Sequence, residues 1–372
     1  MERAINHIRL SLALGAGCRA ASLVCTRYPD LSAFLEGGET EWKLSGLVSA
    51  RQIARLHSVS REDARRVYEK AIRLGFQVLT PWDAAYPSRL RNIEDFPVVL
   101  YVWGALPDID NLISIAMVGT RNASNYGARA ADMLASGITK AGALVVSGAA
   151  LGVDSAAHKA ALLAGGKTVA VLGCGLDTPY LISNLPLRRE IAANGAVISE
   201  FPPGYPAGKS TFPIRNRIIS GLCLGTVVIE AGIRSGSLVT AKHALRQGRD
   251  VFVVPGSILS PQFEGTNQLL RDGCKPVAEP YDILAEYEER YGAGLRIPEP
   301  NAAASTPDPP FPPPQLTHDE SYLYSILSNR PRPLDDLCAA SGLPVSSVVS
   351  ALTSLELKGG CELLPGGLYR KK

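Results

Sequence analysis

The sequence of 372 residues has few of the features that mark secreted, membrane or strongly charged proteins. Its seven cysteines are an odd number without a CxxC pair, which argues against a disulfide framework or a zinc site and favours reduced thiols. No apolar run is long enough to span a bilayer, and MERAINHIRL at the start lacks the segments of a signal peptide. These absences predict a cytoplasmic protein with no membrane partner.

The chain also has little excess of charge of either sign. The formal net charge is only +3, so any basic surface must be local. Hydrophobic residues make up 46% and charged residues 20% of the chain, as in ordinary globular proteins, and the length suggests more than one domain.

Four segments differ in their residue pattern. Residues 1–80 have apolar positions at helical spacing and predict a helical domain. Residues 81–291 alternate apolar runs with Ala-rich helical stretches, which predicts a doubly wound α/β domain with a parallel sheet. The proline-rich residues 292–316 predict a semi-rigid linker. Residues 317–372 predict a helix-turn-helix around Gly342 and a closing hairpin, ELLPGGLYR, as its wing.

A ligand site is expected at the carboxyl ends of the parallel strands, where open α/β sheets bind ligands and helix N-termini present free N–H groups. Each loop there would pass as an ordinary strand-to-helix turn, but six polar, Gly-rich loops at one edge predict phosphate binding. No GxGxxG fingerprint with its acidic partner and no Walker GxxxxGK[ST] motif is present. The first loop contains Gly119, Thr120, Arg121 and Ser124, the second runs from Ser147 to Asp154, and the fifth contains Ser235, Gly236 and Ser237.

A local basic stretch favours a polyanion over a single nucleotide. Residues 207–249 carry seven Lys and Arg residues against one acid, Glu230. Within this stretch, FPIRNRIISGL places Arg215 and Arg217 on either side of Asn216 at the start of a helix. An arginine fork suits phosphate geometry, although two solvated surface arginines are the alternative.

Two further residues of the basic stretch are candidates for contact with a nucleic acid. Lys209 precedes the helix that carries Arg215. Phe212 either stacks on a base or belongs to the core, and both interpretations stay open.

Catalytic groups are not evident. Asp154 and His158 lie four residues apart on one helical face, but a capping aspartate and a structural histidine explain this spacing equally well. Glu230 ends a buried strand and either pairs with an arginine or accepts backbone N–H bonds. We therefore expect no enzyme, no cofactor and no metal.

Several motifs resemble those of the DprA family, the DNA-processing proteins of natural transformation. They occur in the family's order between about Thr80 and Tyr281, as VGTRNASNYG, VVSGAALGVDSAAHKAAL, VAVLGCGLD, FPIRNRIISGL, VIEAGIRSGSLVTAKHALRQGRDVFVVPG and GTNQLLRDG. The first helices resemble the family's sterile-alpha-motif-like or helix-hairpin-helix extension, and the tail resembles its winged-helix domain.

The resemblance implies an extended Rossmann fold that binds and protects incoming single-stranded DNA, forms a homodimer and loads the RecA recombinase. It implies phosphate or DNA contacts for Gly119, Thr120, Arg121, Ser147, Gly148, Lys209, Phe212, Arg215, Asn216, Arg217, Gly236 and Ser237.

Two alternatives stay open. One is a nucleotide-processing enzyme similar to the phosphoribohydrolases. Their PGGxGT loop is missing, however, and the stretch of this sequence that comes nearest to it is EAGIRSGS. The other is a transcriptional regulator, which the winged helix suggests. The charge of the tail argues against a regulator, because residues 317–372 hold six basic and six acidic residues. The helix that would read DNA, PVSSVVSALTSLELKG, has only Lys358 as a cation. We expect a protein-contact or regulatory role for the tail.

Overall fold

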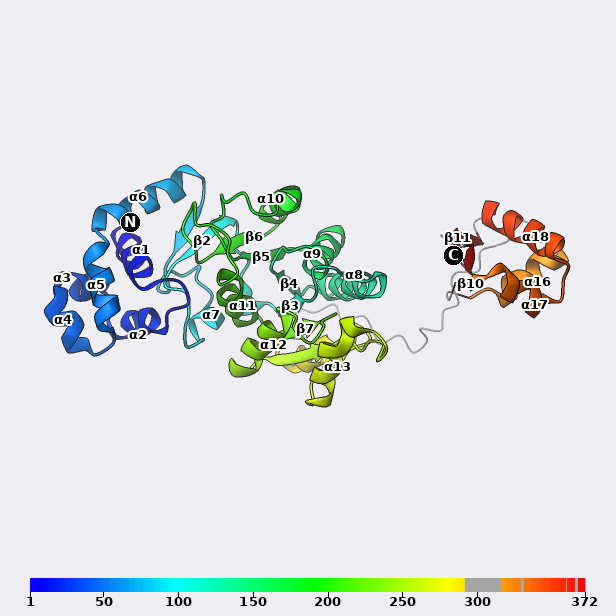
Figure 1. Ribbon diagram of the computed structural model, residues 1–372. Coiled ribbons are helices and arrows are strands. Elements are labelled where there is room, and N and C mark those ends of the chain that lie inside the picture. Colours follow the sequence, from blue (N-terminus) through cyan, green and yellow to red (C-terminus); the bar gives the residue numbers. More distant parts are fainter. Residues whose placement is uncertain (292–315, 329–330, 359, 365–366, 372) are drawn as a thin grey trace. The chain divides into compact units, whose positions relative to one another are not determined.

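The computed structural model describes residues 1–291, 316–328, 331–358, 360–364 and 367–371. The chain divides into two compact units, residues 1–300 and 301–372, which Figure 1 colours from blue to yellow and from orange to red. The linker expected at 292–316 lies, except for Leu316, outside the described residues.

A nine-stranded sheet forms the centre of the larger unit, in the order β1-β2-β6-β5-β4-β3-β7-β8-β9. All neighbours from β6 to β9 pair in parallel, whereas β1 and β2 are antiparallel additions. The expected doubly wound α/β fold is thus confirmed, with β1, β2 and β9 as strands that the sequence did not predict. The strands are β1 Gln77–Leu79, β2 Leu100–Gly104, β3 Ser114–Val118, β4 Leu144–Ser147, β5 Thr168–Leu172, β6 Ala196–Ser199, β7 Gly225–Val228, β8 Asp250–Val253 and β9 Lys275–Pro276.

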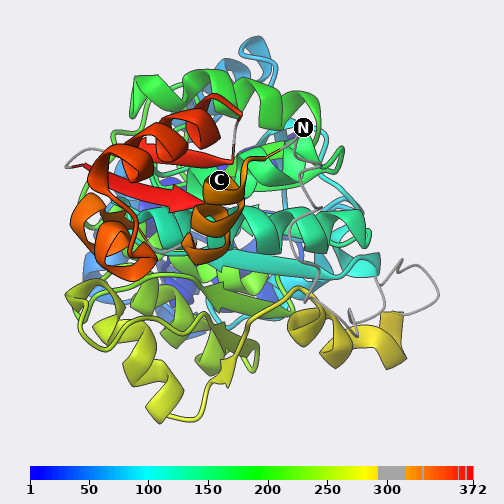
Figure 2. The ribbon, with the colours of Figure 1, turned by 90° about the vertical axis from the view of Figure 1, so that its right-hand side faces the viewer.

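Helices cover both faces of this sheet, because its central strands are apolar on both sides. Successive side chains of β3 show the two layers: Ile115 and Met117 pack with the core under α8 and α9, whereas Ala116 and Val118 pack with the core on the other face. Figures 1 and 2 show these helices around the strands. The helices are α7 Ser88–Arg91, α8 Asn125–Lys140, α9 Val153–Leu163, α10 Leu185–Ala193, α11 Thr211–Gly221, α12 Ser237–Arg246, α13 Glu264–Arg271, α14 Tyr281–Leu284 and α15 Glu288–Tyr291.

The strand order reverses at β3. The chain passes from β3 to β4 on one side, and later places β7 on the other side. The loops that follow β3 and β7 therefore diverge and leave a crevice at the carboxyl ends of these strands, which is where open α/β sheets bind ligands.

Six helices precede the sheet, as the helical pattern of the first segment predicted. Their apolar faces share one continuous core with the sheet, since Ile5, Phe34 and Leu56 belong to the same buried cluster as Leu100 and Val197. The domain boundary near residue 80 stays a prediction. The helices are α1 Glu2–Leu14, α2 Arg19–Arg27, α3 Leu31–Glu36, α4 Gly38–Ser45, α5 Ala50–Ser58 and α6 Arg61–Arg73.

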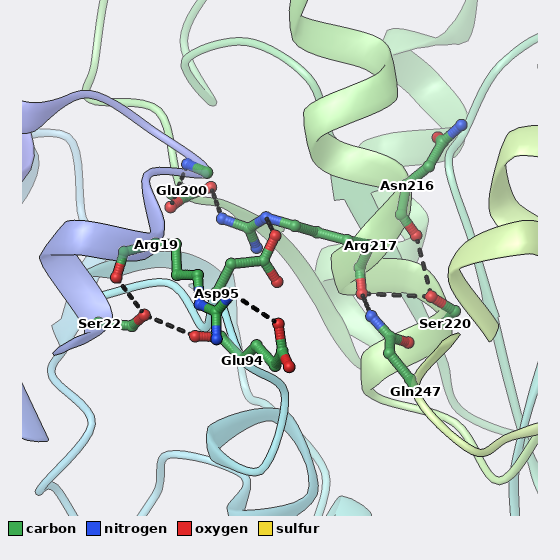
Figure 3. Close-up of polar contacts among 10 residues, drawn as sticks. Arg19, Ser22, Glu94, Asp95, Glu200, Asn216, Arg217, Ser220 and Gln247 are labelled. Atoms are coloured by element: carbon green, nitrogen blue, oxygen red, sulfur yellow. Dashed lines mark hydrogen bonds and ion pairs between the residues drawn. The ribbon is translucent and has the colours of Figure 1, made fainter. Parts of the chain in front are cut away.

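A buried arginine joins these helices to the sheet (Figure 3). Arg217 of α11 is 2% exposed; its Nη2 donates to Glu200 Oε2 at 2.6 Å, and its Nε lies 3.4 Å from Asp95 Oδ2. Glu200 follows β6 and also accepts the N–H of Gly17, between α1 and α2, at 3.1 Å. Burial raises the pKa of Glu200, while the Arg217 guanidinium opposes this shift. One ion pair thus connects three distant segments of the chain.

The substitution Arg217→Ala is expected to lower the free energy of unfolding of the larger unit by about 3–5 kcal/mol, because it leaves the Glu200 carboxylate buried without its cation. Urea unfolding followed by circular dichroism measures the loss. The double variant Glu200→Gln/Arg217→Met, which removes both charges, should recover most of it. Arg246→Ala, at an exposed position of α12, is the matched control, and an equal loss in both single variants would contradict the assignment.

The smaller unit is a winged helix, as expected. It contains α16 His318–Ile326, α17 Leu334–Ser341 and α18 Val345–Leu357, and an antiparallel sheet of β10 Arg332–Pro333, β12 Leu368–Lys371 and β11 Cys361–Leu364. Gly342 adopts φ +66° in the turn between α17 and α18, and β11 and β12 form the wing. Within the described residues no single helix has the length and hydropathy to cross a bilayer; α17 and α18 meet those two criteria only as a pair bent by 112°.

The cation of the recognition helix is engaged inside this unit. Lys358, at the end of α18, donates to both carboxylate oxygens of the buried Glu320 at 2.9 and 2.7 Å. The same carboxylate accepts the N–H of Thr317, which begins α16, at 2.7 Å. The hydrogen bond from Lys358 lowers the pKa of Glu320 to about 2. This arrangement supports the expectation that the tail binds duplex DNA at most weakly.

The Glu320 pair predicts a pH dependence. A carboxyl whose pKa is lower in the folded state stabilises that state above its ordinary pKa of 4.5, and this stabilisation is lost as the pH falls toward 2. Lys358→Met should raise the pKa of Glu320 toward 4.5 and flatten the pH dependence between pH 5 and pH 2. Carboxyl NMR of glutamate-labelled protein measures this pKa. Arg370→Met, which breaks a half-exposed pair with Glu362, should leave it unchanged, and an unshifted Glu320 in Lys358→Met would contradict the assignment.

Candidate nucleic-acid interface

A hollow of about 270 Å³ occupies the crevice at the carboxyl ends of β3, β4 and β7. It lies where the strand order reverses, and the N-terminal parts of α11 and α12 border it. We call it the phosphate hollow. Its lining includes most of the residues singled out in the sequence, namely Gly119, Thr120, Arg121, Phe212, Arg215, Asn216, Gly236 and Ser237, together with Ala150, Asp154, Ser235 and Thr240.

Glu230 fixes the loop that carries Thr120 and Arg121. This glutamate is fully buried at the end of β7, and its carboxylate accepts the N–H and the hydroxyl of Ser124 at 3.0 and 2.7 Å. A Cβ on Gly127 would lie 2.0 Å from the same carboxylate, so only glycine permits this approach. Glu230 was expected either to pair with an arginine or to accept hydrogen bonds, and the structure shows the second. These hydrogen bonds hold the loop at the rim of the hollow.

Arg215 forms the floor of the hollow. Its side chain is 5% exposed, and its Nη1 donates to the carbonyl of Val171 at 2.5 Å. A Cβ on Gly148 would lie 1.9 Å from this nitrogen, so the glycine makes room for the guanidinium. Burial lowers the pKa of Arg215, and the attraction of the Asp154 carboxylate opposes this shift. Its Nε has no hydrogen-bond partner among the described residues.

Phe212 lies close to two cations. The guanidinium carbons of Arg121 and Arg215 are 4.9 and 6.0 Å from the centre of its ring. The ring is half-buried and packs at 5.3 Å against that of Tyr180, while Arg121 is exposed at the rim. The hollow therefore brings one aromatic ring together with two guanidinium groups, which are the groups that bind unpaired bases and their phosphates.

Comparison with known proteins shows that residues 77–288 match the family described as DNA recombination-mediator protein A. The chain belongs to this family. Residues 307–367 match the DprA winged helix domain, so the family resemblance of both parts is confirmed.

Relatives are similar over most of their own length. The chain is 45% identical to DNA processing protein DprA of Streptococcus pneumoniae over 206 residues, which are 55% of this chain and 72% of that protein. It is 38% identical to protein Smf of Escherichia coli K12 over 299 residues, 78% and 77% of the two chains.

Two solved structures of the family are similar in fold. The X-ray structure of DprA from S. pneumoniae has a TM-score of 0.66 at 36% identity and covers 76% of this chain and 97% of that one. The structure reported for the single-stranded DNA binding mode of DNA processing protein A from Helicobacter pylori has a TM-score of 0.52 at 30% identity, with coverage of 58% and 98%.

The structure corrects the expectation for Arg217. Two residues apart on an α-helix, side chains point about 200° away from each other. Since Arg215 faces the phosphate hollow, Arg217 faces the opposite side, where Glu200 and Asp95 hold it in the interior. It therefore lies outside the hollow and has no exposed guanidinium to offer a phosphate.

Three other residues for which the family resemblance implied a phosphate or DNA contact also lie outside the lining of the hollow. Ser147 is fully buried and donates to the carbonyl of Met117 at 2.6 Å, which corrects its expected ligand contact. Gly148 acts through the space it leaves for Arg215. Lys209 is exposed in the loop before α11, and its contact with a ligand stays a prediction.

The basic stretch does not form one face. Of its seven cations, Arg215 lines the hollow, whereas Arg249 precedes β8 and so lies at the amino ends of the strands, where its Nη2 donates to the carbonyl of Arg89 at 3.1 Å. The second guanidinium of the hollow, that of Arg121, comes from outside the stretch. Linear clustering of charge was therefore a poor guide to the surface.

Asp154 and His158 have structural surroundings. His158 is fully buried, its Nδ1 lies 2.8 Å from the Thr168 hydroxyl, and burial lowers its pKa to about 3. Asp154 accepts the N–H groups of Gly148 and Ala150 at 3.2 and 3.4 Å. These contacts favour the structural explanation of their spacing.

The residues of the site that sequence reasoning missed include Thr240 and Tyr180. Thr240 lines the hollow one turn after Ser237 of α12, so helical periodicity was the signal that would have found it. Tyr180 packs on Phe212 from a loop 32 residues earlier in the sequence, and no local pattern indicates such a contact.

Gly148→Ala is expected to destabilise the chain by about 1–3 kcal/mol, because the new methyl group overlaps the Arg215 guanidinium in a packed interior. Urea unfolding measures the change. The control is Gly236→Ala in the lining of the hollow, where a Cβ meets no atom within 4 Å and should cost less than about 0.5 kcal/mol. Equal losses in the two variants would show that Gly148 does not make room for Arg215.

Proposed function

We propose that the chain binds single-stranded DNA in the phosphate hollow, protects incoming strands and loads RecA recombinase onto them. The observation that carries the proposal is that the guanidinium groups of Arg121 and Arg215 both lie within about 6 Å of the Phe212 ring, at 4.9 and 6.0 Å, where the strand order reverses. An aromatic ring binds any unpaired base by stacking, and guanidinium groups bind the phosphates beside it. A duplex does not expose a base face to such a ring.

The relatives support this proposal. The family is described as a recombination mediator, and the H. pylori relative is described as a single-stranded DNA binder. RecA loading rests on the family resemblance alone. We propose a role without catalysis, because Asp154, His158 and Glu230 are each occupied by contacts that hold the fold.

A homodimer in the cytoplasm is part of the proposal. Ile258 and Leu259, in the loop after β8, are 87% and 88% exposed, and a second copy of the chain would cover such apolar side chains. All seven cysteines are free, which fits a reducing compartment.

The nucleotide-processing enzyme remains the second candidate, since the phosphate hollow has room for a single nucleotide. Titrations of a labelled oligo-dT, a matched duplex and free nucleotides separate the two. Preference for the unpaired oligonucleotide without nucleotide turnover supports the proposal, and turnover of a nucleotide supports the enzyme.

Arg121→Ala should weaken binding of oligo-dT at low salt and reduce the steepness of the salt dependence. The loss of one phosphate contact lowers the slope of log affinity against log salt by about 0.7. Fluorescence anisotropy between 50 and 300 mM salt measures both, and RecA filament formation on the same strands should fall in parallel.

The matched control is Arg51→Ala, which removes an exposed guanidinium from α5, away from the hollow. It should keep both the affinity and the slope of the wild type. An Arg121→Ala variant that binds like this control would remove the assignment of the hollow.

A further inference from the structure

A second hollow, of about 440 Å³, lies between the end of α6, strand β2 and the loop that leads into α10. We call it the aromatic groove. Its walls are mainly apolar, and the rings of Phe76 and Trp103 lie 6.5 Å apart with their planes tilted by 52°. The apolar part of its lining also includes Leu74, Tyr180 and Ile182, and Asp177, Arg188 and Arg189 are its charged residues.

The groove exposes apolar side chains that no described part of the chain covers. Ile182 is 66% and Leu74 is 43% exposed, and Trp103 is only partly buried. These side chains come from three segments distant in the sequence and gather at one place. Single exposed apolar residues are ordinary, but such a gathering beside a polar rim marks a binding surface.

The groove lies next to the phosphate hollow. Tyr180 lines the groove, and its ring packs at 5.3 Å against Phe212, which lines the hollow. The two aromatic rings thus form the wall that the two sites share. A chain that leaves the hollow across Phe212 meets the groove next.

The charge of the groove suits an anionic chain. Arg188 is 3% exposed; its Nη2 donates to the carbonyl of Tyr180 at 2.6 Å, and its Nε has no hydrogen-bond partner among the described residues. Arg189 beside it is exposed. The acid of the lining, Asp177, is paired with Lys70 at 3.0 Å. Cations are therefore in excess around the apolar walls.

We propose that the aromatic groove holds a base of the same DNA strand whose phosphate occupies the phosphate hollow. The proposal rests on the proposed function and extends it: the strand crosses the Phe212–Tyr180 wall, and a following base packs among Trp103, Phe76 and Ile182. An apolar peptide would also fit the walls. The excess of arginine and the shared aromatic wall favour a nucleotide.

The test compares oligo-dT of increasing length on the full chain. Wild-type affinity should rise once the strand is long enough to reach the groove, by about tenfold for one stacked base. Ile182→Glu places a carboxylate at the exposed edge of the groove and should abolish this rise, while the affinity for the shortest oligonucleotides stays within twofold of the wild type. Leu44→Glu, the same change at a position 77% exposed on α4, should behave as the wild type.

A second measurement does not depend on any variant. Abasic sites placed one at a time along a long oligonucleotide should lower wild-type affinity at two separate positions, one for Phe212 and one for the groove. A single sensitive position, or an Ile182→Glu variant that binds long strands as tightly as Leu44→Glu, would overturn the groove. The proposed function would survive that result, because it fails only if Arg121→Ala keeps full affinity for the shortest oligonucleotides.

Discussion

The buried ion pair between Arg217 and Glu200 determines which way α11 faces. With Arg217 turned into the interior, the geometry of the helix turns Arg215 toward the phosphate hollow. The same carboxylate holds the N–H of Gly17 between the first two helices. The amide at this hairpin is therefore satisfied within the protein, and the hairpin works as a joint between the helices and the sheet. The position of the arginine that lines the hollow thus depends on a residue outside it.

The central sheet was predictable because its strands are buried on both faces. Such strands are apolar on both faces, as in TVAVL and TVVI after their first threonine, and stand out from the Ala-rich helices between them. The edge strands β1, β2 and β9 gave no such signal. β1 has three residues, and its partner β2 lies some twenty residues further along, so the pairing depends on tertiary structure. The winged helix was predictable from the turn at Gly342 and the closing hairpin.

The glycine turns of the candidate site could be predicted from the sequence, whereas the directions in which its side chains point could not. The glycine turns after β3 and β7 follow from the rule that ligands bind at the carboxyl ends of strands. Arg217 was misplaced because neighbours in sequence were taken as neighbours in space. Its partner Asp95 lies far away in the chain, and nothing local distinguishes a buried arginine from an exposed one. Gly148 was expected to contact a phosphate, whereas the structure shows that it makes room for Arg215.

The net charge of the chain is small, and the cations of residues 207–249 are scattered, so a broad positive field does not explain how this protein would hold DNA. The geometry offers preorganisation instead. The backbone carbonyl of Val171 holds the Arg215 guanidinium by a hydrogen bond before any ligand arrives, and Gly148 leaves the space in which it lies. The side-chain entropy of this arginine is thus lost in folding and not in binding, which raises the net gain from each contact. Under the proposed function, a fixed guanidinium beside an aromatic ring would take the place of the many mobile lysines of a strongly basic binder.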